Sequence, residues 1–261
     1  MGGREVYGRW ALVAGASEGL GAAFAEALGG RGHDLLLIAR RAEPLEGLAR
    51  HLGQKHRVEV RTLALDLASP ELSSRVNAFI DGREVGVLIC NAAAAPLGPF
   101  ADQSLTDKVL AIDVNCRSPV VLLDLILPPM IARARGAVVL MSSLTAFQGS
   151  PYASIYGATK AFNLSLAEAL WSELGSSGVQ VIATCAGATR TPGYLQRAAQ
   201  GGAPGELEPA QVAEETLAAL SSGPMVIPGA FNRIASFLMR RLMPRRATIG
   251  LMGAQTRKLL R

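Results

Sequence analysis

Short apolar runs alternate with longer amphipathic stretches along most of the chain. The apolar runs, which are rich in Val, Leu, Ile and Ala, cover residues 10–15, 34–39, 58–65, 85–90, 137–141, 179–185 and 225–227. Continuous apolar runs of this length are typical of parallel strands that are buried on both faces. Helical spacing is found between them at residues 19–31, 42–54, 105–128 and 209–220, near residue 69 and after residue 156. The pattern predicts an α/β fold with helices on both faces of a parallel sheet.

The composition is that of one large domain. The chain has 261 residues, of which 49% are hydrophobic and 18% are charged, so it can bury a large core. No apolar run reaches the roughly 18–20 residues that span a bilayer, and the N-terminus has no apolar signal core. An odd number of cysteines, without metal-ligand spacing, lies at positions 90, 116 and 185. These features predict a reduced, cytoplasmic protein without a metal site.

The stretch from Ser143 to Lys160 carries residues suited to acid–base chemistry. Tyr156 and Lys160 are four residues apart, so they share one face if the stretch opens a helix. A tyrosine hydroxyl has a pKa of about 10 in isolation, and a nearby ammonium lowers that pKa. Ser143 follows a predicted strand, and ligands bind at the carboxyl ends of strands in open α/β sheets. Taken alone, the Tyr–Lys pair is more typical of a half-buried tyrosine beside a surface lysine.

A glycine-rich turn near the N-terminus changes this interpretation. Gly15, Gly19 and Gly21 follow the first apolar run and precede an alanine-rich helical stretch. Gly15 permits a tight turn, Gly19 lets the backbone approach a pyrophosphate, and Gly21 lets helix and strand pack closely. The helix N-terminus offers free N–H groups to phosphates. Strand, turn and helix together indicate a dinucleotide site.

The glycine-rich turn, the serine and the Tyr-x-x-x-Lys pair together resemble the short-chain dehydrogenase/reductase family. The resemblance implies a doubly wound Rossmann-type sheet of about seven parallel strands in the order 3-2-1-4-5-6-7. It implies that Ser143 and Tyr156 bind the substrate oxygen and that Tyr156 transfers the proton. Lys160 would lower the pKa of Tyr156 and bind the nicotinamide ribose. Asn115 would hold a helix distortion and a water, although an asparagine can also simply bond within its own helix.

The resemblance also implies which residues hold the cofactor. They would face the pyrophosphate, the adenosine and the nicotinamide in turn, and they are Gly15, Ser17, Glu18, Gly19, Leu20, Gly21, Arg40, Arg41, Asp66, Leu67, Asn91, Ala92, Ala93, Tyr156, Lys160, Gly187, Thr189 and Thr191. Two family motifs are altered. Alanine replaces the usual glycine at position 93, and alanine replaces the usual proline at position 186.

The end of the second predicted strand favours NADP(H) over NAD(H). Enzymes that prefer the non-phosphorylated cofactor usually place an acid here, whereas this chain has Ala39 and then Arg40 and Arg41. A guanidinium can bind a 2′-phosphate, and the absence of a carboxylate removes a repulsion. The alternative is that both arginines lie in solvent at the sheet edge, and NAD(H) then remains possible.

The predicted substrate surroundings are mostly apolar. The candidates are Ala94, Leu97, Phe147, Pro151, Tyr152, Tyr194 and Leu195. They favour a lipophilic ketone or aldehyde as substrate. Residues 193–207 are rich in glycine and are expected to form a mobile lid over that substrate.

We therefore predict an NADP(H)-dependent oxidoreductase that transfers hydride between the nicotinamide and a carbonyl or secondary alcohol. Alternatives within the family are an NAD-linked alcohol dehydrogenase and a 3-oxoacyl reductase. An alternative from another class is a cofactor-binding sensor or scaffold without turnover, against which the intact Asn115, Ser143, Tyr156 and Lys160 argue. Apolar residues on more than one face of the stretches 120–125 and 164–171 predict a homodimer or homotetramer.

The basic charge of the chain is concentrated at its C-terminal end. The net charge is +5, and eight basic residues fall within the last 29 residues, where there is no acid. We expect a Rossmann-type catalytic domain over residues 1–228 and a basic, partly amphipathic extension over residues 229–261. The extension could fold back over the site or an oligomer partner, lie on an anionic membrane surface, or bind an acidic partner such as an acyl carrier protein. Nothing indicates nucleic-acid binding.

Overall fold

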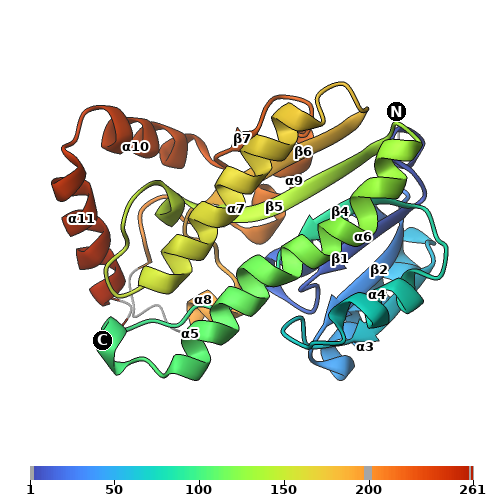
Figure 1. Ribbon diagram of the computed structural model, residues 1–261, viewed down its shortest axis with the longest axis horizontal. Coiled ribbons are helices and arrows are strands. Elements are labelled where there is room, and N and C mark those ends of the chain that lie inside the picture. The colour runs from blue at the N-terminus through green and yellow to red at the C-terminus, as the bar shows by residue number, and fades with distance from the viewer. Residues whose placement is uncertain (1–2, 197–201, 259, 261) are drawn as a thin grey trace.

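Seven parallel strands form one sheet in the order β3-β2-β1-β4-β5-β6-β7, which confirms the predicted fold class and strand order (Figure 1). The computed structural model describes residues 3–196, 202–258 and 260. The strands are β1 (Trp10–Ala14), β2 (Asp34–Ala39), β3 (Val60–Ala64), β4 (Val85–Cys90), β5 (Gly136–Ser143), β6 (Val179–Ala186) and β7 (Met225–Val226). Every residue of β1, β2, β4 and β5 is buried, as expected for strands that are covered on both faces.

Two hydrophobic cores lie on opposite faces of the sheet. Successive residues of a strand point to opposite faces, so Leu12 packs in one core with Leu122, and Val13 packs in the other with Phe24. The first core is covered by α4 (Leu72–Ile80), α6 (Ser118–Ala132) and α7 (Ser154–Glu173). The second is covered by α2 (Gly19–Gly29), α3 (Ala42–His56) and α9 (Pro209–Ala218). The remaining helices are α1 (Gly3–Tyr7), α5 (Leu105–Ile112), α8 (Pro192–Leu195), α10 (Ala230–Arg241) and α11 (Arg245–Lys258).

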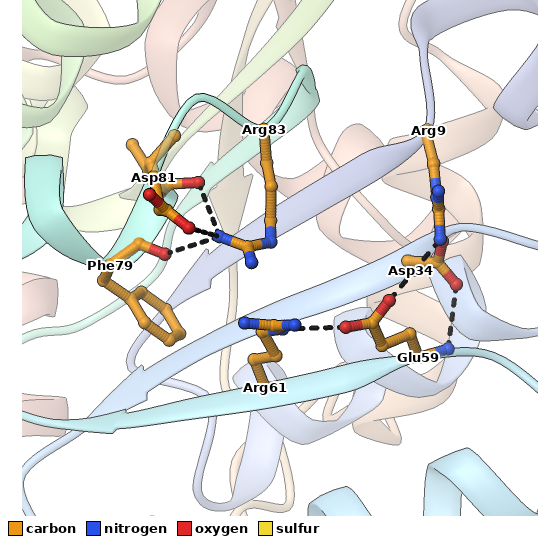
Figure 2. Close-up of polar contacts among 8 residues, drawn as sticks. Arg9, Asp34, Glu59, Arg61, Phe79, Asp81 and Arg83 are labelled. Carbon is orange, nitrogen blue, oxygen red and sulfur yellow. Dashed lines mark hydrogen bonds and ion pairs between the residues drawn. The ribbon is translucent and has the colours of Figure 1, made fainter.

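Charged side chains occupy the amino ends of β1, β2 and β3. Figure 2 shows Arg9 facing Asp34 and Glu59, with Arg61 on the far side of Glu59. The Asp34 carboxylate is almost fully buried, and it accepts hydrogen bonds from Arg9 Nε at 2.5 Å and from the Glu59 backbone N–H at 2.8 Å. These ion pairs hold three strand ends in register and leave the opposite, carboxyl edge of the sheet to the predicted site.

Two predicted helix boundaries are wrong. The helix expected near residue 69 begins at Leu72, because Ser69 instead forms a turn in which its hydroxyl accepts from the Glu71 N–H at 3.1 Å. The helix expected to end at Pro128 continues through Pro128 and Pro129 to Ala132. Both prolines are exposed, and each leaves one carbonyl of the preceding turn without its helical N–H partner.

The C-terminal residues form two helices, and none of the described helices is long and apolar enough to cross a membrane. α11 packs beside the loop that joins β5 to α7 (Figure 1). Gly253 lies against Pro151, where an added Cβ would come within 3.0 Å of the proline ring. Arg257 Nη2 donates to the Tyr152 hydroxyl at 2.6 Å. α11 therefore folds back on the segment that leads into α7.

Candidate functional site

Three of the predicted catalytic residues lie at the junction of β5 and α7. Ser143 is the last residue of β5, pairs in register with Ala186 of β6, and is buried. Its hydroxyl accepts a hydrogen bond from the Thr145 N–H at 3.2 Å. Tyr156 lies in the first turn of α7 and Lys160 lies one turn later. Strand end and helix start thus bring the serine, the tyrosine and the lysine to the carboxyl edge of the sheet, where ligands bind.

Lys160 is a buried ammonium beside the ring of Tyr156. Only 2% of the residue is exposed, its Nζ donates to the Met141 carbonyl at 2.9 Å, and it lies 5.5 Å from the centre of the Tyr156 ring. Burial lowers the pKa of Lys160 to about 8, because the charged form loses solvation. A cation so placed favours the phenolate form of the tyrosine.

Asn115 lies in a π-helical turn, Asp113–Arg117, that joins α5 to α6. Its side chain bonds to two other segments instead of to its own helix. The amide nitrogen donates to the Ala94 carbonyl at 2.8 Å and to Thr159 Oγ1 at 2.9 Å, and the amide oxygen accepts from the Ala94 N–H at 2.8 Å. Asn115 therefore ties the loop after β4 to the turn of α7 that carries Lys160.

Thr159 is a site residue that the sequence analysis missed. Its hydroxyl accepts from Asn115 and donates to the Tyr156 carbonyl at 2.8 Å. The residue is buried, so it connects the π turn to the helix of the Tyr–Lys pair. Its position directly before Lys160 was visible in the sequence, but the contact with Asn115 joins residues 44 apart, and no local pattern indicates it.

The glycine-rich turn is closed by backbone contacts that leave no room for side chains. A Cβ on Gly21 would lie 1.9 Å from the Gly15 carbonyl oxygen, and a Cβ on Gly15 would lie 2.6 Å from Ala92. Asn91 Nδ2 donates to the Gly15 carbonyl at 2.8 Å. Gly19 has a φ of 58°, and a Cβ there would meet Thr191 at 2.9 Å. The turn, the loop after β4 and the loop after β6 thus meet around one cradle, which suits a dinucleotide with its pyrophosphate at the start of α2. Ser17 and Leu20 belong to the same turn and helix start.

The predicted adenosine-binding residues follow the ends of β2 and β3. Arg40 and Arg41 are both exposed, and Arg41 pairs with Glu18 at 2.7 Å. Within the described part of the chain, no carboxylate pairs with Arg40. Asp66 is exposed and its carboxylate accepts from the Ala68 N–H at 2.9 Å, while the neighbouring Leu67 is buried. Arg40 is therefore the unpaired cation at this end of the cradle.

The loop after β6 carries the residues predicted to hold the nicotinamide. Thr189 is buried and its hydroxyl donates to the Gly187 carbonyl at 3.1 Å. Thr191 caps α8, with its hydroxyl accepting from the Tyr194 N–H at 3.3 Å. The sequence analysis missed Asn232 of α10, whose amide would lie 2.9 Å from a Cβ on Gly187. The C-terminal segment therefore fixes the back of this loop.

The two departures from the family motifs sit in different surroundings. Ala93 is exposed, and its φ is negative, so an alanine fits there without backbone strain. Ala186 is buried at the end of β6.

The predicted substrate residues come from three segments. Ala94 and Leu97 lie after β4, a second group lies between β5 and α7, and Tyr194 and Leu195 belong to α8. The first two segments are joined by the Gly98 N–H, which donates to the Tyr152 carbonyl at 2.8 Å. In the second group, Pro151 and Tyr152 contact α11, and Phe147 stacks under a guanidinium of α10.

The predicted lid is described only in part. Tyr194 donates a hydrogen bond from its hydroxyl to Glu206, and the Ala203 N–H donates to the same carboxylate at 2.6 Å. These bonds link the two described ends of the segment. Residues 197–201 of the predicted lid lie outside the described residues.

Comparison with known proteins agrees with this geometry. A family model for short chain dehydrogenases matches residues 9–200. A 7beta-hydroxysteroid dehydrogenase of Collinsella aerofaciens is 32% identical over 236 residues, which are 88% of this chain and 89% of that protein.

Two solved structures extend the comparison to three dimensions. One, from work on the stereoselectivity of 7beta-hydroxysteroid dehydrogenase, has a TM-score of 0.91 at 29% identity and covers 97% of this chain and 99% of the other. A short-chain dehydrogenase from Sphingobium yanoikuyae in complex with NADPH has a TM-score of 0.80 at 32% identity, with 94% and 95% covered. The matched residues contain the glycine-rich turn, Ser143 and the Tyr156–Lys160 pair. The chain is an oxidoreductase that belongs to the short-chain dehydrogenase family.

Proposed function

We propose that the protein is an NADP(H)-dependent reductase of lipophilic ketones or aldehydes. The observation that carries the proposal is the buried Lys160 ammonium beside the Tyr156 ring, linked through Thr159 to Asn115 at the carboxyl edge of the sheet. An NAD(P)(H) cofactor, when bound, supplies the hydride. The protein would then have to bind the substrate oxygen, orient the carbonyl and deliver a proton.

The residues of the site can perform these tasks. Ser143 and Tyr156 would donate hydrogen bonds to the carbonyl oxygen and would stabilise the negative charge that develops on it. Tyr156 would give up its proton, and the Lys160 cation would stabilise the phenolate that remains. Asn115 would act as a positioning residue, because it fixes the turn of α7 through Thr159. Gly15, Gly19 and Gly21 would hold the pyrophosphate against α2, and Thr189 and Thr191 would orient the nicotinamide.

The substrate proposal rests on the mostly apolar residues that are predicted to surround the substrate and on the relatives named above. A 7beta-hydroxysteroid dehydrogenase acts on a bulky, lipophilic molecule, so we expect NADPH consumption with cyclic and steroidal ketones before small polar aldehydes. The measurement is the loss of NADPH absorbance across a panel of such ketones, with NADH run beside it. Turnover confined to NAD⁺ and alcohols would favour the NAD-linked dehydrogenase instead. Binding of NADPH without turnover of any substrate would favour the scaffold.

Arg40 is expected to select the phosphorylated cofactor. The substitution Arg40→Gln removes the unpaired cation at the end of β2, so NADPH should bind about tenfold more weakly while NADH affinity stays within about twofold. Both affinities can be measured by nicotinamide fluorescence. Arg61→Gln, at the charged amino end of the sheet, is the matched control and should change neither. Equal losses for the two cofactors in Arg40→Gln would contradict the proposed role.

We also propose a homodimer or homotetramer in a reducing compartment. Large apolar side chains are exposed along α5, α6 and α7, among them Leu105, Val109, Val120, Ile131, Phe162 and Trp171. Several large apolar side chains exposed on neighbouring helices are typical of protein interfaces. All three cysteines are free thiols, which is in keeping with a compartment that holds thiols reduced.

A further inference from the structure

Helix α10 presents a continuous apolar stripe to solvent. Phe231, Ile234, Leu238 and Leu242 are spaced three, four and four residues apart, so they line one side of the helix. Their exposed fractions are 55%, 62%, 44% and 70%. Single exposed apolar residues are ordinary, but an exposed stripe of four marks an interaction surface.

The opposite side of α10 is what holds it to the domain. Asn232 and Ser236, one turn apart, are the buried residues of the helix. Asn232 Nδ2 donates to the Pro228 carbonyl and to the Gly205 carbonyl, both at 3.1 Å. Phe231, at the start of the helix, also lies against Gly205. The helix is therefore anchored by Asn232, Ser236 and this contact, and the rest of its apolar side is turned outward. This is the reverse of the usual packing of a surface helix.

Basic side chains flank the stripe. Between the stripe and the anchored side lies a hollow of about 250 Å³, whose walls are Ile227, Arg233, Ser236, Phe237, Arg240 and Arg241. Arg241, Arg245 and Arg246 are exposed, and none of them is in an ion pair with a described residue. No acid follows Glu215 in the sequence. Arg233 is neutralised by Glu215 of α9 at 3.0 Å. The cations left around α10 therefore include Arg241, Arg245 and Arg246, and no carboxylate of their own segment neutralises them.

The charge decides between the two occupants that could cover such a stripe. A twofold contact between two copies places the same surface on both sides. Such a contact brings together two segments that carry no acid from Thr216 to Arg261, so the matching segment offers the arginines no opposite charge. An anionic bilayer offers an apolar layer for the stripe and phosphates for the arginines, and a helix with this division of faces is suited to lie in such an interface.

We propose that α10 docks this protein on the surface of an anionic lipid bilayer, with Phe231, Ile234, Leu238 and Leu242 inserted among the acyl chains. The helix lies in the interface and does not span it. Asn232 connects α10 to Gly205, at the end of the predicted lid, so docking places the substrate side near the bilayer. A lipophilic ketone is concentrated there; this last point rests on the proposed function.

The test is co-sedimentation of the full chain with lipid vesicles. We expect the protein to bind vesicles of phosphatidylcholine containing phosphatidylglycerol at least about tenfold more strongly than vesicles of phosphatidylcholine alone, and less strongly as salt is raised. The double variant Ile234→Asp with Leu242→Asp should lose at least about tenfold in binding. Val6→Asp is the matched control, because Val6 of α1 is 45% exposed and lies outside α10, and it should bind like the wild type.

Three results would overturn the proposal. The first is equal or absent binding to the two kinds of vesicle. The second is a wild-type protein that does not bind vesicles and is an oligomer in sedimentation velocity, while the double variant is a monomer. A second copy would then cover the stripe. The third is vesicle binding that is abolished in the double variant Arg241→Gln with Arg245→Gln but intact in the double variant Ile234→Asp with Leu242→Asp. That result would indicate a purely electrostatic contact. NADPH-dependent turnover of the same samples without vesicles separates these results from failure of the proposed function.

Discussion

Replacing Tyr156 with phenylalanine should lower kcat for carbonyl reduction by about a thousandfold while leaving NADPH affinity within about twofold of the wild type. The substitution removes only the hydroxyl. The ring stays beside the Lys160 ammonium, from which its centre is 5.5 Å away, so the fold of α7 should persist. What is lost is the proton donor to the developing alkoxide. Single-turnover rates and a fluorescence titration with NADPH measure the two quantities separately.

Tyr7→Phe is the matched control for this experiment. The Tyr7 hydroxyl donates to Gln180 Oε1 at 2.6 Å, between α1 and the amino end of β6, away from the site. Its loss should cost about 1 kcal/mol of stability and leave kcat unchanged. If Tyr156→Phe kept more than about a tenth of the wild-type kcat, tyrosine would not be the proton donor and the proposed mechanism would be wrong.

The sequence predicted those site residues whose chemistry is distinctive and whose spacing lies within one helix or follows directly from one strand. Tyr156 and Lys160 share a face because they are four apart in a helix, and Ser143 follows from the strand that precedes it. The strand order came with the family resemblance and was confirmed by the sheet. Gly15 and Gly21 were expected to permit close approach, and each would indeed clash with backbone if it carried a Cβ.

Contacts between distant segments could not be obtained in this way. Asn115 was named from the resemblance, but its partner Thr159 is 44 residues away. Asn232 contacts Gly187 and Gly205 from α10, a helix that carries none of the family motifs. The sequence indicated a partly amphipathic extension over residues 229–261, but an amphipathic helix usually packs its apolar side against the domain. Only the structure shows that two buried polar residues anchor the helix and leave the apolar side exposed.

Lys160→Met should make the cofactor-free protein more stable even though it lowers kcat. Burial lowers the pKa of Lys160 from 10.5 to about 8, and a difference of this size corresponds to a cost of about 3 kcal/mol for keeping the charge buried near neutral pH. Methionine has a similar shape and carries no charge. It also loses the hydrogen bond to the Met141 carbonyl, which is worth about 1 kcal/mol. We therefore expect a net gain of about 1–2 kcal/mol in the free energy of unfolding.

The dependence on pH distinguishes this cause from simple repacking. Between about pH 8 and pH 10.5 the unfolded lysine is protonated and the folded lysine is largely neutral. The unfolded state then binds more protons, so the stability of the wild type rises with pH in this window. Below about pH 8 both states are protonated and the full cost is present. The advantage of Lys160→Met in urea denaturation should therefore be largest below pH 8 and should shrink as the pH approaches 10.

Activity should move in the opposite direction to stability. Without the ammonium, the Tyr156 phenolate has no neighbouring cation, so kcat should fall at least about a hundredfold. Lys55→Met, at an exposed lysine that pairs with Glu26, is the control and should change stability by less than about 0.5 kcal/mol. A Lys160→Met protein less stable than the wild type at pH 7 would show that the lysine contributes more to the fold through its hydrogen bond than its buried charge costs. The stabilisation and the lost turnover together would identify Lys160 as a residue that is held at the expense of stability for the sake of the reaction.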